Sequence, residues 1–245
     1  MPKIYLDGPA GKLEGMYHKA ENPKAPTALV LHPNPLYGGT MNNKITYHLY
    51  KAFVSNGFSV LRINFRGVGG SSGKFANGTG ELEDVNATLD WLRNQNPQSS
   101  HYWLAGFSFG AFVAMQSIMR RPEIENFILV SPPASRYNCN FFSPCPISGL
   151  IIQGSEDGIS KATDTEKLVQ NCQKQKGIRV LYECIQGADH FFNEDYIEDF
   201  DEIVHNHIQN SINSKIIKPL IKVRKRMKNK KTSSTNSSKQ FKIVC

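Results

Sequence analysis

A serine flanked by glycines lies near the middle of the chain, in the pentapeptide Gly106-Phe107-Ser108-Phe109-Gly110. An apolar run precedes this pentapeptide at 102–105, and a stretch with a helical pattern, Ala-Phe-Val-Ala-Met, follows it. A G-x-S-x-G pattern between a strand and a helix is typical of a nucleophile elbow, a strained turn that presents a serine hydroxyl near a helix N-terminus. We therefore expect Ser108 to act as a nucleophile; the alternative is a plain Gly-Ser turn.

A serine hydroxyl is a weak nucleophile unless a base accepts its proton, and that base is often histidine. In proteins with such an elbow the acid and the histidine follow the serine along the chain. This order leaves His190, His205 and His207 of the seven histidines. His190 lies in a loop directly after an apolar run, whereas the other two fall in an expected helix, where an exposed polar position is the ordinary explanation. We predict that His190 is the base.

A carboxylate should orient the imidazole and stabilise its cation. The apolar run 149–153 ends in Gly-Ser-Glu-Asp-Gly, which places two acidic residues directly after an expected strand and between Ser108 and His190. We predict Asp157 as this acid, with Glu156 as the alternative. Asp189 would point away from the serine if His190 reaches it, so we expect Asp189 to shape the loop.

Two backbone N–H groups are needed to stabilise the oxyanion of an acyl-transfer reaction. One is expected from Phe109, the residue after the nucleophile. The other is expected from the loop at 32–39, His-Pro-Asn-Pro-Leu-Tyr-Gly-Gly. Because its two prolines have no N–H, Asn34 or Leu36 must donate, and we favour Asn34. We expect His32 to support this loop by hydrogen bonding rather than to take part in catalysis.

Short apolar runs alternate with amphipathic helical patterns along the chain, which indicates βαβ units around a parallel sheet. Buried parallel strands are short, continuous and rich in Val, Ile and Leu. An antiparallel pair is expected at 3–6 and 13–18. We predict an α/β fold with a mostly parallel central sheet and helices on both faces. The parallel strands are expected at 27–32, 58–65, 101–106, 126–130, 149–153 and 179–184, and the helices at 45–53, 82–92, 111–119, 163–173 and 196–204.

The segment Ser131–Ser148 joins the strand after the nucleophile helix to the strand that precedes the acid. It contains four prolines and is too short for a helical cap. We therefore expect a minimal lid and an open site with an aromatic rim, although about half of the aromatic residues should pack in the core. The rim candidates are Tyr37, Phe107, Tyr137, Phe141, Phe142 and Phe191.

A glycine-rich segment at 67–73 resembles a dinucleotide-binding fingerprint. Its spacing is G-x-G-x-x-x-G, no helix follows at once, and the next expected strand does not end in an acidic residue. We expect a tight loop at the carboxyl edge of the sheet, with phosphate binding as the minor alternative. No metal ion or organic cofactor is expected.

The formal net charge of +8 is concentrated at the C-terminus. Residues 214–245 contain 11 Lys and Arg and no Asp or Glu, which leaves 18 basic against 21 acidic residues in 1–213. We predict a catalytic domain over 1–213 and a disordered, low-complexity tail over 214–245. The tail is expected to be a solvated extension; the alternative is weak contact with anionic membrane or RNA, without specific nucleic-acid recognition.

Five cysteines without a C-x-x-C pair indicate a reducing compartment, and no apolar stretch approaches the roughly 20 residues of a membrane-spanning helix. The first 15 residues lack the apolar core of a secretory signal. A cytoplasmic location is therefore expected.

Five ordered segments make the chain similar to the α/β-hydrolase superfamily, and most similar to its small, uncapped bacterial members related to dienelactone-hydrolase-type esterases. They lie within roughly residues 27–192 and read HPNPLYGGTMNNK, NFRGVGGSSG, LAGFSFGA, IIQGSEDG and GADHFF. The resemblance implies a Ser108–Asp157–His190 triad. Dienelactone hydrolase has a cysteine nucleophile where this chain has serine, so its particular substrate is not carried over.

The expected activity is that of a serine hydrolase, a carboxylesterase that cleaves small or medium acyl and aryl esters through an acyl-enzyme. A peptidase, a thioesterase or a lysophospholipase on the same triad is the alternative, because a fold does not fix a substrate. A different class of protein, a non-catalytic adaptor that docks through its basic tail, is the remaining hypothesis.

Overall fold

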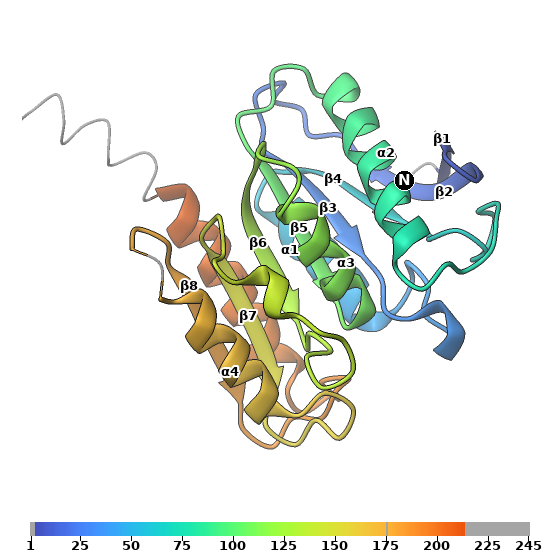
Figure 1. Ribbon diagram of the computed structural model, residues 1–245. Coiled ribbons are helices and arrows are strands. Elements are labelled where there is room, and N and C mark those ends of the chain that lie inside the picture. The colour runs from blue at the N-terminus through green and yellow to red at the C-terminus, as the bar shows by residue number, and fades with distance from the viewer. Residues whose placement is uncertain (1–2, 175, 214–245) are drawn as a thin grey trace, which may run out of the picture. The chain divides into compact units, whose positions relative to one another are not determined.

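Eight strands form one sheet in the computed structural model, which describes residues 3–174 and 176–213 (Figure 1). Their order across the sheet is β1-β2-β4-β3-β5-β6-β7-β8. The strands are β1 (Lys3–Gly8), β2 (Gly11–His18), β3 (Thr27–Leu31), β4 (Ser59–Ile63), β5 (Tyr102–Phe107), β6 (Ile124–Val130), β7 (Gly149–Gly154) and β8 (Val180–Ile185).

The strands from β4 to β8 in this order pair in parallel, whereas β2 pairs antiparallel with both β1 and β4. Every residue of β3, β4 and β7 is buried, as expected of parallel strands covered on both faces. The predicted fold class is therefore confirmed. The apolar runs located the parallel strands well, since each predicted parallel strand overlaps an observed one.

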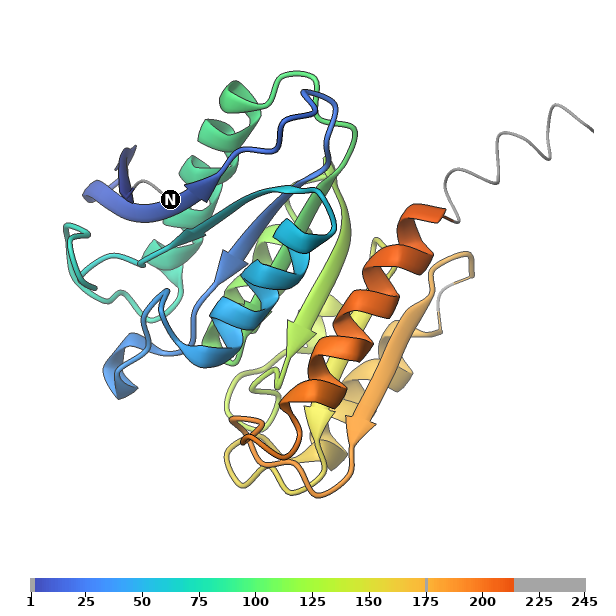
Figure 2. The same ribbon diagram turned by 180° about the vertical axis from the view of Figure 1, so that it is seen from behind.

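Helices cover both faces of the sheet. In Figure 1, α2 (Thr79–Gln95), α3 (Phe109–Ile118) and α4 (Ala162–Cys172) lie in front of the sheet, and Figure 2 shows α1 (Lys44–Ser55) on the opposite face. Residues 197–213 form the last helix. Its first part contacts α1, because Asp201 accepts a hydrogen bond from His48 Nδ1 at 2.9 Å.

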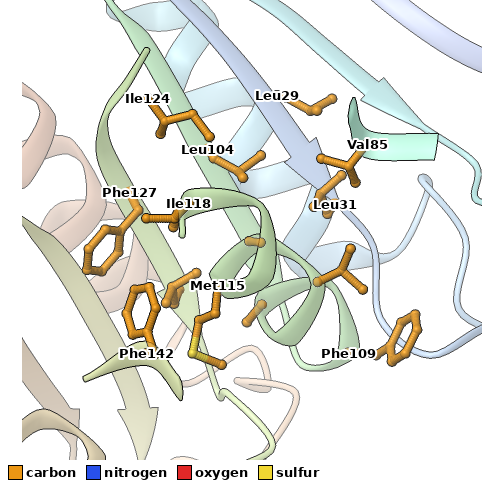
Figure 3. Packing of buried hydrophobic residues seen from close by; sticks show 14 of the residues in the cluster. Leu29, Leu31, Val85, Leu104, Phe109, Met115, Ile118, Ile124, Phe127 and Phe142 are labelled. Carbon is orange, nitrogen blue, oxygen red and sulfur yellow. The ribbon is translucent and has the colours of Figure 1, made fainter. Parts of the chain in front are cut away.

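The helix that carries the elbow is buried along almost its whole length. Met115 and Ile118 of α3 belong to the same apolar cluster as Phe127 of β6 and Phe142 (Figure 3). Burying one such side chain stabilises a fold by roughly 1.5–3 kcal/mol. The core therefore fixes α3 against the sheet. The helix begins at Phe109, two residues before the predicted start, because the turn at the serine leads directly into it.

Within the described residues, no helix combines the length and the apolar character needed to cross a bilayer. Four cysteines in this part of the chain are free thiols: Cys139, Cys145, Cys172 and Cys184. The predicted tail, 214–245, lies outside the described residues, and the predicted domain boundary before it stays a prediction.

Candidate active site

The predicted elbow is a sharp turn between β5 and α3. Ser108 has φ 53° and ψ −115°, a strained backbone conformation for a residue other than glycine. Its own N–H donates to the carbonyl oxygen of Val130 at 2.8 Å. The flanking glycines are needed for space. A Cβ on Gly106 would lie 2.4 Å from the carbonyl oxygen of Gly110, and one on Gly110 would lie 2.5 Å from that of Leu31.

Three loops bring a hydroxyl, an imidazole and a carboxylate into line. His190 Nε2 lies 3.1 Å from Ser108 Oγ, and His190 Nδ1 lies 2.7 Å from Asp157 Oδ2. Ser108 follows β5, Asp157 follows β7 and His190 follows β8, so the three groups meet at the carboxyl edge of the sheet. Their exposed fractions are 9%, 5% and 4%. Of the two neighbouring carboxylates, Asp157 contacts the imidazole, and Glu156 is exposed.

The Asp157 carboxylate is held in its ionised form. Burial acts to raise its pKa, but hydrogen bonds from His190 and from the backbone N–H of Ser160 and Ile159 outweigh burial and lower it. These N–H groups donate to Oδ1 at 2.7 and 2.8 Å. Because an ionised carboxylate only accepts hydrogen bonds, the facing Nδ1 of His190 carries the proton. The other ring nitrogen, Nε2, is then free to accept the proton of Ser108.

A buried amide that the sequence analysis missed also contacts the acid. Gln153, the penultimate residue of β7, donates from Nε2 to Asp157 Oδ2 at 2.8 Å and to the carbonyl oxygen of Ser160 at 3.0 Å. Its Oε1 accepts from the Thr165 hydroxyl at 2.9 Å, which fixes the orientation of the amide. A polar residue at the end of an otherwise apolar run was the only available signal for Gln153.

The two predicted oxyanion donors face the same cavity. Asn34 Oδ1 accepts from the Leu36 N–H at 2.9 Å, so this alternative donor is already engaged. Asn34 and Phe109 both line the cavity beside Ser108. Among the described residues, neither the Asn34 N–H nor the Phe109 N–H has a hydrogen-bond partner. The N–H groups of Asn34 and Phe109 are therefore free to donate to a bound molecule.

His32 holds the loop that carries Asn34. It is fully buried; its Nε2 accepts from the Phe65 N–H at 3.0 Å, and its Nδ1 donates to the Pro33 carbonyl oxygen at 2.6 Å. Burial lowers the pKa of His32 to about 4, so the ring is neutral at pH 7. The expected supporting role of His32 agrees with these contacts.

The loop around His190 and the last helix account for the remaining polar candidates. Asp189 Oδ1 accepts from the Phe191 N–H at 2.9 Å and so shapes the loop, as expected. His205 is exposed, with Nδ1 3.2 Å from Asn56 Nδ2. His207 is instead buried, and burial lowers its pKa to about 4. The expectation of an exposed position is therefore wrong for His207.

Ser108 and His190 open into a cavity of about 650 Å³, within the range of roughly 300–1,000 Å³ that is usual for small-ligand pockets. Three of the six predicted rim aromatics line it: Tyr37, Tyr137 and Phe191. Phe107 and Phe142 are core residues, and Phe141 lies outside the lining.

The mouth of the cavity is open to solvent. Tyr37 is 78% exposed and Phe191 is 51% exposed. The segment 131–148 contains one short 3₁₀ turn, Asn140–Phe142, and no helical cap. The predicted minimal lid is confirmed. Phe75 also lines the cavity, and the sequence analysis did not identify it.

The glycine-rich segment forms the tight loop that was expected. Its N–H groups bond to the protein itself: Gly70 donates to Glu14 Oε2 at 2.6 Å, and Ser71 donates to the Val68 carbonyl oxygen at 2.9 Å. Glu14 is buried and also accepts from Asn64 Nδ2 at 2.8 Å. The carboxylate thus already accepts a hydrogen bond from this loop.

A serine hydrolase with the α/β-hydrolase fold is the class that this sheet, elbow and histidine define. Comparison with known proteins gives the same class and a narrower assignment. Residues 19–207 match the X-Pro dipeptidyl-peptidase (S15) family, and the chain belongs to that family within the α/β-hydrolase superfamily.

Similar proteins come from several bacteria. The uncharacterized protein RP471 of Rickettsia prowazekii is 51% identical over 212 residues, which are 85% of this chain and 89% of the relative. ATU1826 from Agrobacterium tumefaciens, described as a protein of unknown function and a candidate α/β hydrolase, is 43% identical with a TM-score of 0.84. That match covers 87% of this chain and 97% of that one.

A third similar protein is described as having no lid. XC6422 from Xanthomonas campestris is described as an α/β serine hydrolase without a lid. It is 30% identical with a TM-score of 0.74, over 85% of this chain and 94% of that one. The absence of a lid is therefore a feature that this chain, in its described residues, shares with a relative.

Proposed function

We propose that this serine hydrolase is a carboxylesterase that cleaves small or medium acyl and aryl esters through an acyl-enzyme. The observation that carries the proposal is the hydrogen-bonded series Ser108 Oγ, His190 Nε2, His190 Nδ1 and Asp157 Oδ2 at the base of an open cavity. In this proposal the three residues form the catalytic triad, and no metal ion or organic cofactor is needed.

Each step follows from the protonation states of the site. Ser108 Oγ attacks the ester carbonyl while His190 Nε2 takes the hydroxyl proton, and Asp157 stabilises the resulting imidazolium. The carbonyl oxygen becomes an oxyanion that the N–H groups of Asn34 and Phe109 stabilise. His190 returns the proton to the leaving alcohol. Water, deprotonated by His190, then attacks the acyl carbon, and His190 returns this proton to Ser108 Oγ as the acid leaves.

The lining of the cavity favours an ester over the N-terminus of a peptide. Release of a dipeptide requires recognition of a free amino terminus, and a protonated amine binds best to a carboxylate. Among the residues that line the cavity in the described part of the chain, none is Asp or Glu. Aromatic side chains instead form much of the wall, which suits acyl and aryl groups. A thioester or a lysophospholipid would use the same chemistry.

The location and the binding partners of the protein are also proposals. A cytoplasmic location and a small-molecule ester as the main partner rest on the sequence. Weak binding of the basic tail to anionic membrane or RNA remains the alternative for residues 214–245, which lie outside the described residues.

The test combines activity with covalent labelling. We expect wild-type protein to hydrolyse p-nitrophenyl acetate and butyrate and to react with a fluorophosphonate probe, and Ser108→Ala to lose both properties. Ser117→Ala is the matched control, because Ser117 is a buried serine on α3, the helix that follows Ser108. Equal labelling of the wild-type and Ser108→Ala proteins would overturn the proposal. Faster cleavage of Gly-Pro-p-nitroanilide or of a thioester than of these esters would favour the alternative activities.

A further inference from the structure

One residue with a permanent charge lines the cavity that holds Ser108. Arg136 shares this lining with aromatic residues and with the uncharged amides of Asn43 and Asn77. Among the lining residues in the described part of the chain, none is Asp, Glu or Lys. The cavity therefore has a positive charge that no lining carboxylate neutralises.

The backbone of Arg136 is held firmly, although its side chain is exposed. The Pro133 carbonyl oxygen accepts from the Arg136 N–H at 3.0 Å. On one side, the Pro132 carbonyl oxygen accepts from the Ser160 hydroxyl at 2.5 Å. On the other, the Ser135 hydroxyl donates to Asp164 at 2.9 Å and accepts from the backbone N–H that precedes α4. These bonds hold the turn from which the Arg136 side chain extends.

The guanidinium has no carboxylate partner in the described residues. Two acidic side chains belong to neighbouring segments, and both are engaged elsewhere. Glu81 accepts from the N–H groups of Ala76 and Gly78 at 2.9 and 2.7 Å. Asp164 bonds to Ser135 and pairs with Lys167 at 3.3 Å. Arg136 is thus available to a bound molecule.

The neighbouring Tyr137 places this charge at the cavity wall. Its ring stacks on Phe112 with centroids 4.3 Å apart, and Tyr137 lines the cavity. Burial raises the pKa of the Tyr137 phenol, whereas the positive charge of Arg136 acts to lower it. The guanidinium is therefore close enough to act electrostatically on a wall residue of the cavity.

We propose that Arg136 forms an anion subsite, separate from the oxyanion donors Asn34 and Phe109. This subsite selects ester substrates that carry a carboxylate or a phosphate remote from the bond that is cleaved. This inference rests on the proposed esterase function and names its substrate class. A guanidinium presents paired N–H donors that match the two oxygens of a carboxylate or phosphate. Loss of such a hydrogen bond to a charged group raises the dissociation constant roughly 10- to 100-fold.

Matched substrates test the subsite. The p-nitrophenyl hemiester of glutaric acid and p-nitrophenyl pentanoate have acyl chains of equal length, and only the first ends in a carboxylate. We expect Arg136→Gln to lower kcat/KM for the hemiester about 10-fold, mainly through KM, and to change that for the pentanoate less than twofold. Arg136→Lys should restore part of the loss. The control is Arg120→Gln, because Arg120 is exposed and lies outside the lining of the cavity.

A second pair of substrates distinguishes the two sources of the oxyanion. A monoacylglycerol and its phosphate ester differ only in the phosphate. A loss in Arg136→Gln that is confined to the phosphate ester would assign the subsite to phosphate, and one confined to the hemiester would assign it to carboxylate. Equal effects on charged and neutral substrates in both pairs, or no effect in either, would overturn the inference.

A binding measurement separates failure of the subsite from failure of the esterase proposal. Monomethyl glutarate is titrated into the Ser108→Ala protein, with and without Arg136→Gln, and NMR shifts report binding. Weaker binding in the double variant supports the subsite even if no ester is hydrolysed. Identical binding in the two proteins, together with turnover of p-nitrophenyl pentanoate by wild type and no loss on the phosphate ester in Arg136→Gln, refutes the subsite and leaves the esterase proposal intact.

Discussion

His32 makes the stability of this enzyme depend on pH in a way that one substitution can isolate. In the folded protein its pKa is about 4, against 6.5 for an ordinary histidine. Below pH 6.5 the unfolded chain therefore binds a proton that the folded ring does not bind, so stability falls as the pH is lowered towards 4. At 1.36 kcal/mol for each unit of pKa, the full loss is about 3 kcal/mol, of which about 1 kcal/mol has occurred by pH 5.5.

The substitution His32→Gln removes this proton-binding group and can retain an acceptor for the Phe65 N–H. At pH 7 we expect the variant to be less stable by about 1–3 kcal/mol, because the Pro33 carbonyl oxygen loses its donor. Between pH 7 and pH 4.5 the gap between wild type and variant should narrow by about 2–3 kcal/mol. Urea unfolding, followed through the buried Trp103, measures this gap at each pH.

Other titrating groups are present in both proteins and cancel in the difference, including His207, whose pKa is also about 4. A gap that stays constant between pH 7 and pH 4.5 would refute the reasoning, because it would mean that His32 takes up its proton equally well in the folded and unfolded chains. A gap that widens as the pH falls would mean that folding raises the pKa of His32 instead of lowering it.

Three further substitutions test other parts of the structure. Gln153→Leu should lower kcat about 10- to 100-fold with little change in KM, measured by steady-state ester hydrolysis, because the acid loses a buried donor. Gly110→Ala should lower the free energy of unfolding by about 1–3 kcal/mol or more, measured by urea titration, because its Cβ would meet a β3 carbonyl oxygen. Arg66→Met should lower the free energy of unfolding by about 3–5 kcal/mol, because Asp84 is left buried without its partner. The control is Arg93→Met, which removes an exposed ion pair and should lower the free energy of unfolding by less than about 1 kcal/mol.

Each of these expectations has a result that contradicts it. A Gln153→Leu protein with unchanged kcat would mean that the backbone N–H groups alone position the acid. A fully stable Gly110→Ala protein would mean that α3 can move away from β3. Equal losses of unfolding free energy in the Arg66 and Arg93 variants would mean that the buried Arg66–Asp84 pair stabilises the fold no more than an exposed ion pair does.

The strands and the three groups in line at the cavity could be predicted because each has a local signal. Apolar runs mark the strands, and Ser108, Asp157 and His190 each lie in the loop that follows one of them. The carboxyl ends of parallel strands share one edge, so chain order was enough to bring the three residues together. Such local reasoning needs no knowledge of which side chains pack against each other.

The residues that were missed have their roles through side-chain contacts that no local sequence pattern shows. Gln153 is informative only once its amide is seen between Asp157 and Thr165. Which rim aromatics are exposed depends on packing between elements, as Phe142 in the core shows. Arg136 gave no signal, because a single arginine in a proline-containing loop is unremarkable until the cavity beside it is known.

The uncovered mouth of the cavity has a consequence for the fate of the proposed acyl-serine. Since no cap closes over it in the described part of the chain, the intermediate is accessible to any small nucleophile that diffuses in, and water competes with added alcohols for the same carbonyl carbon. Product ratios in mixed solvents should then follow the concentration and reactivity of the acceptors, and acyl transfer should accompany hydrolysis. No activation by micelles or lipid–water boundaries is expected, since no gate has to open before the substrate enters.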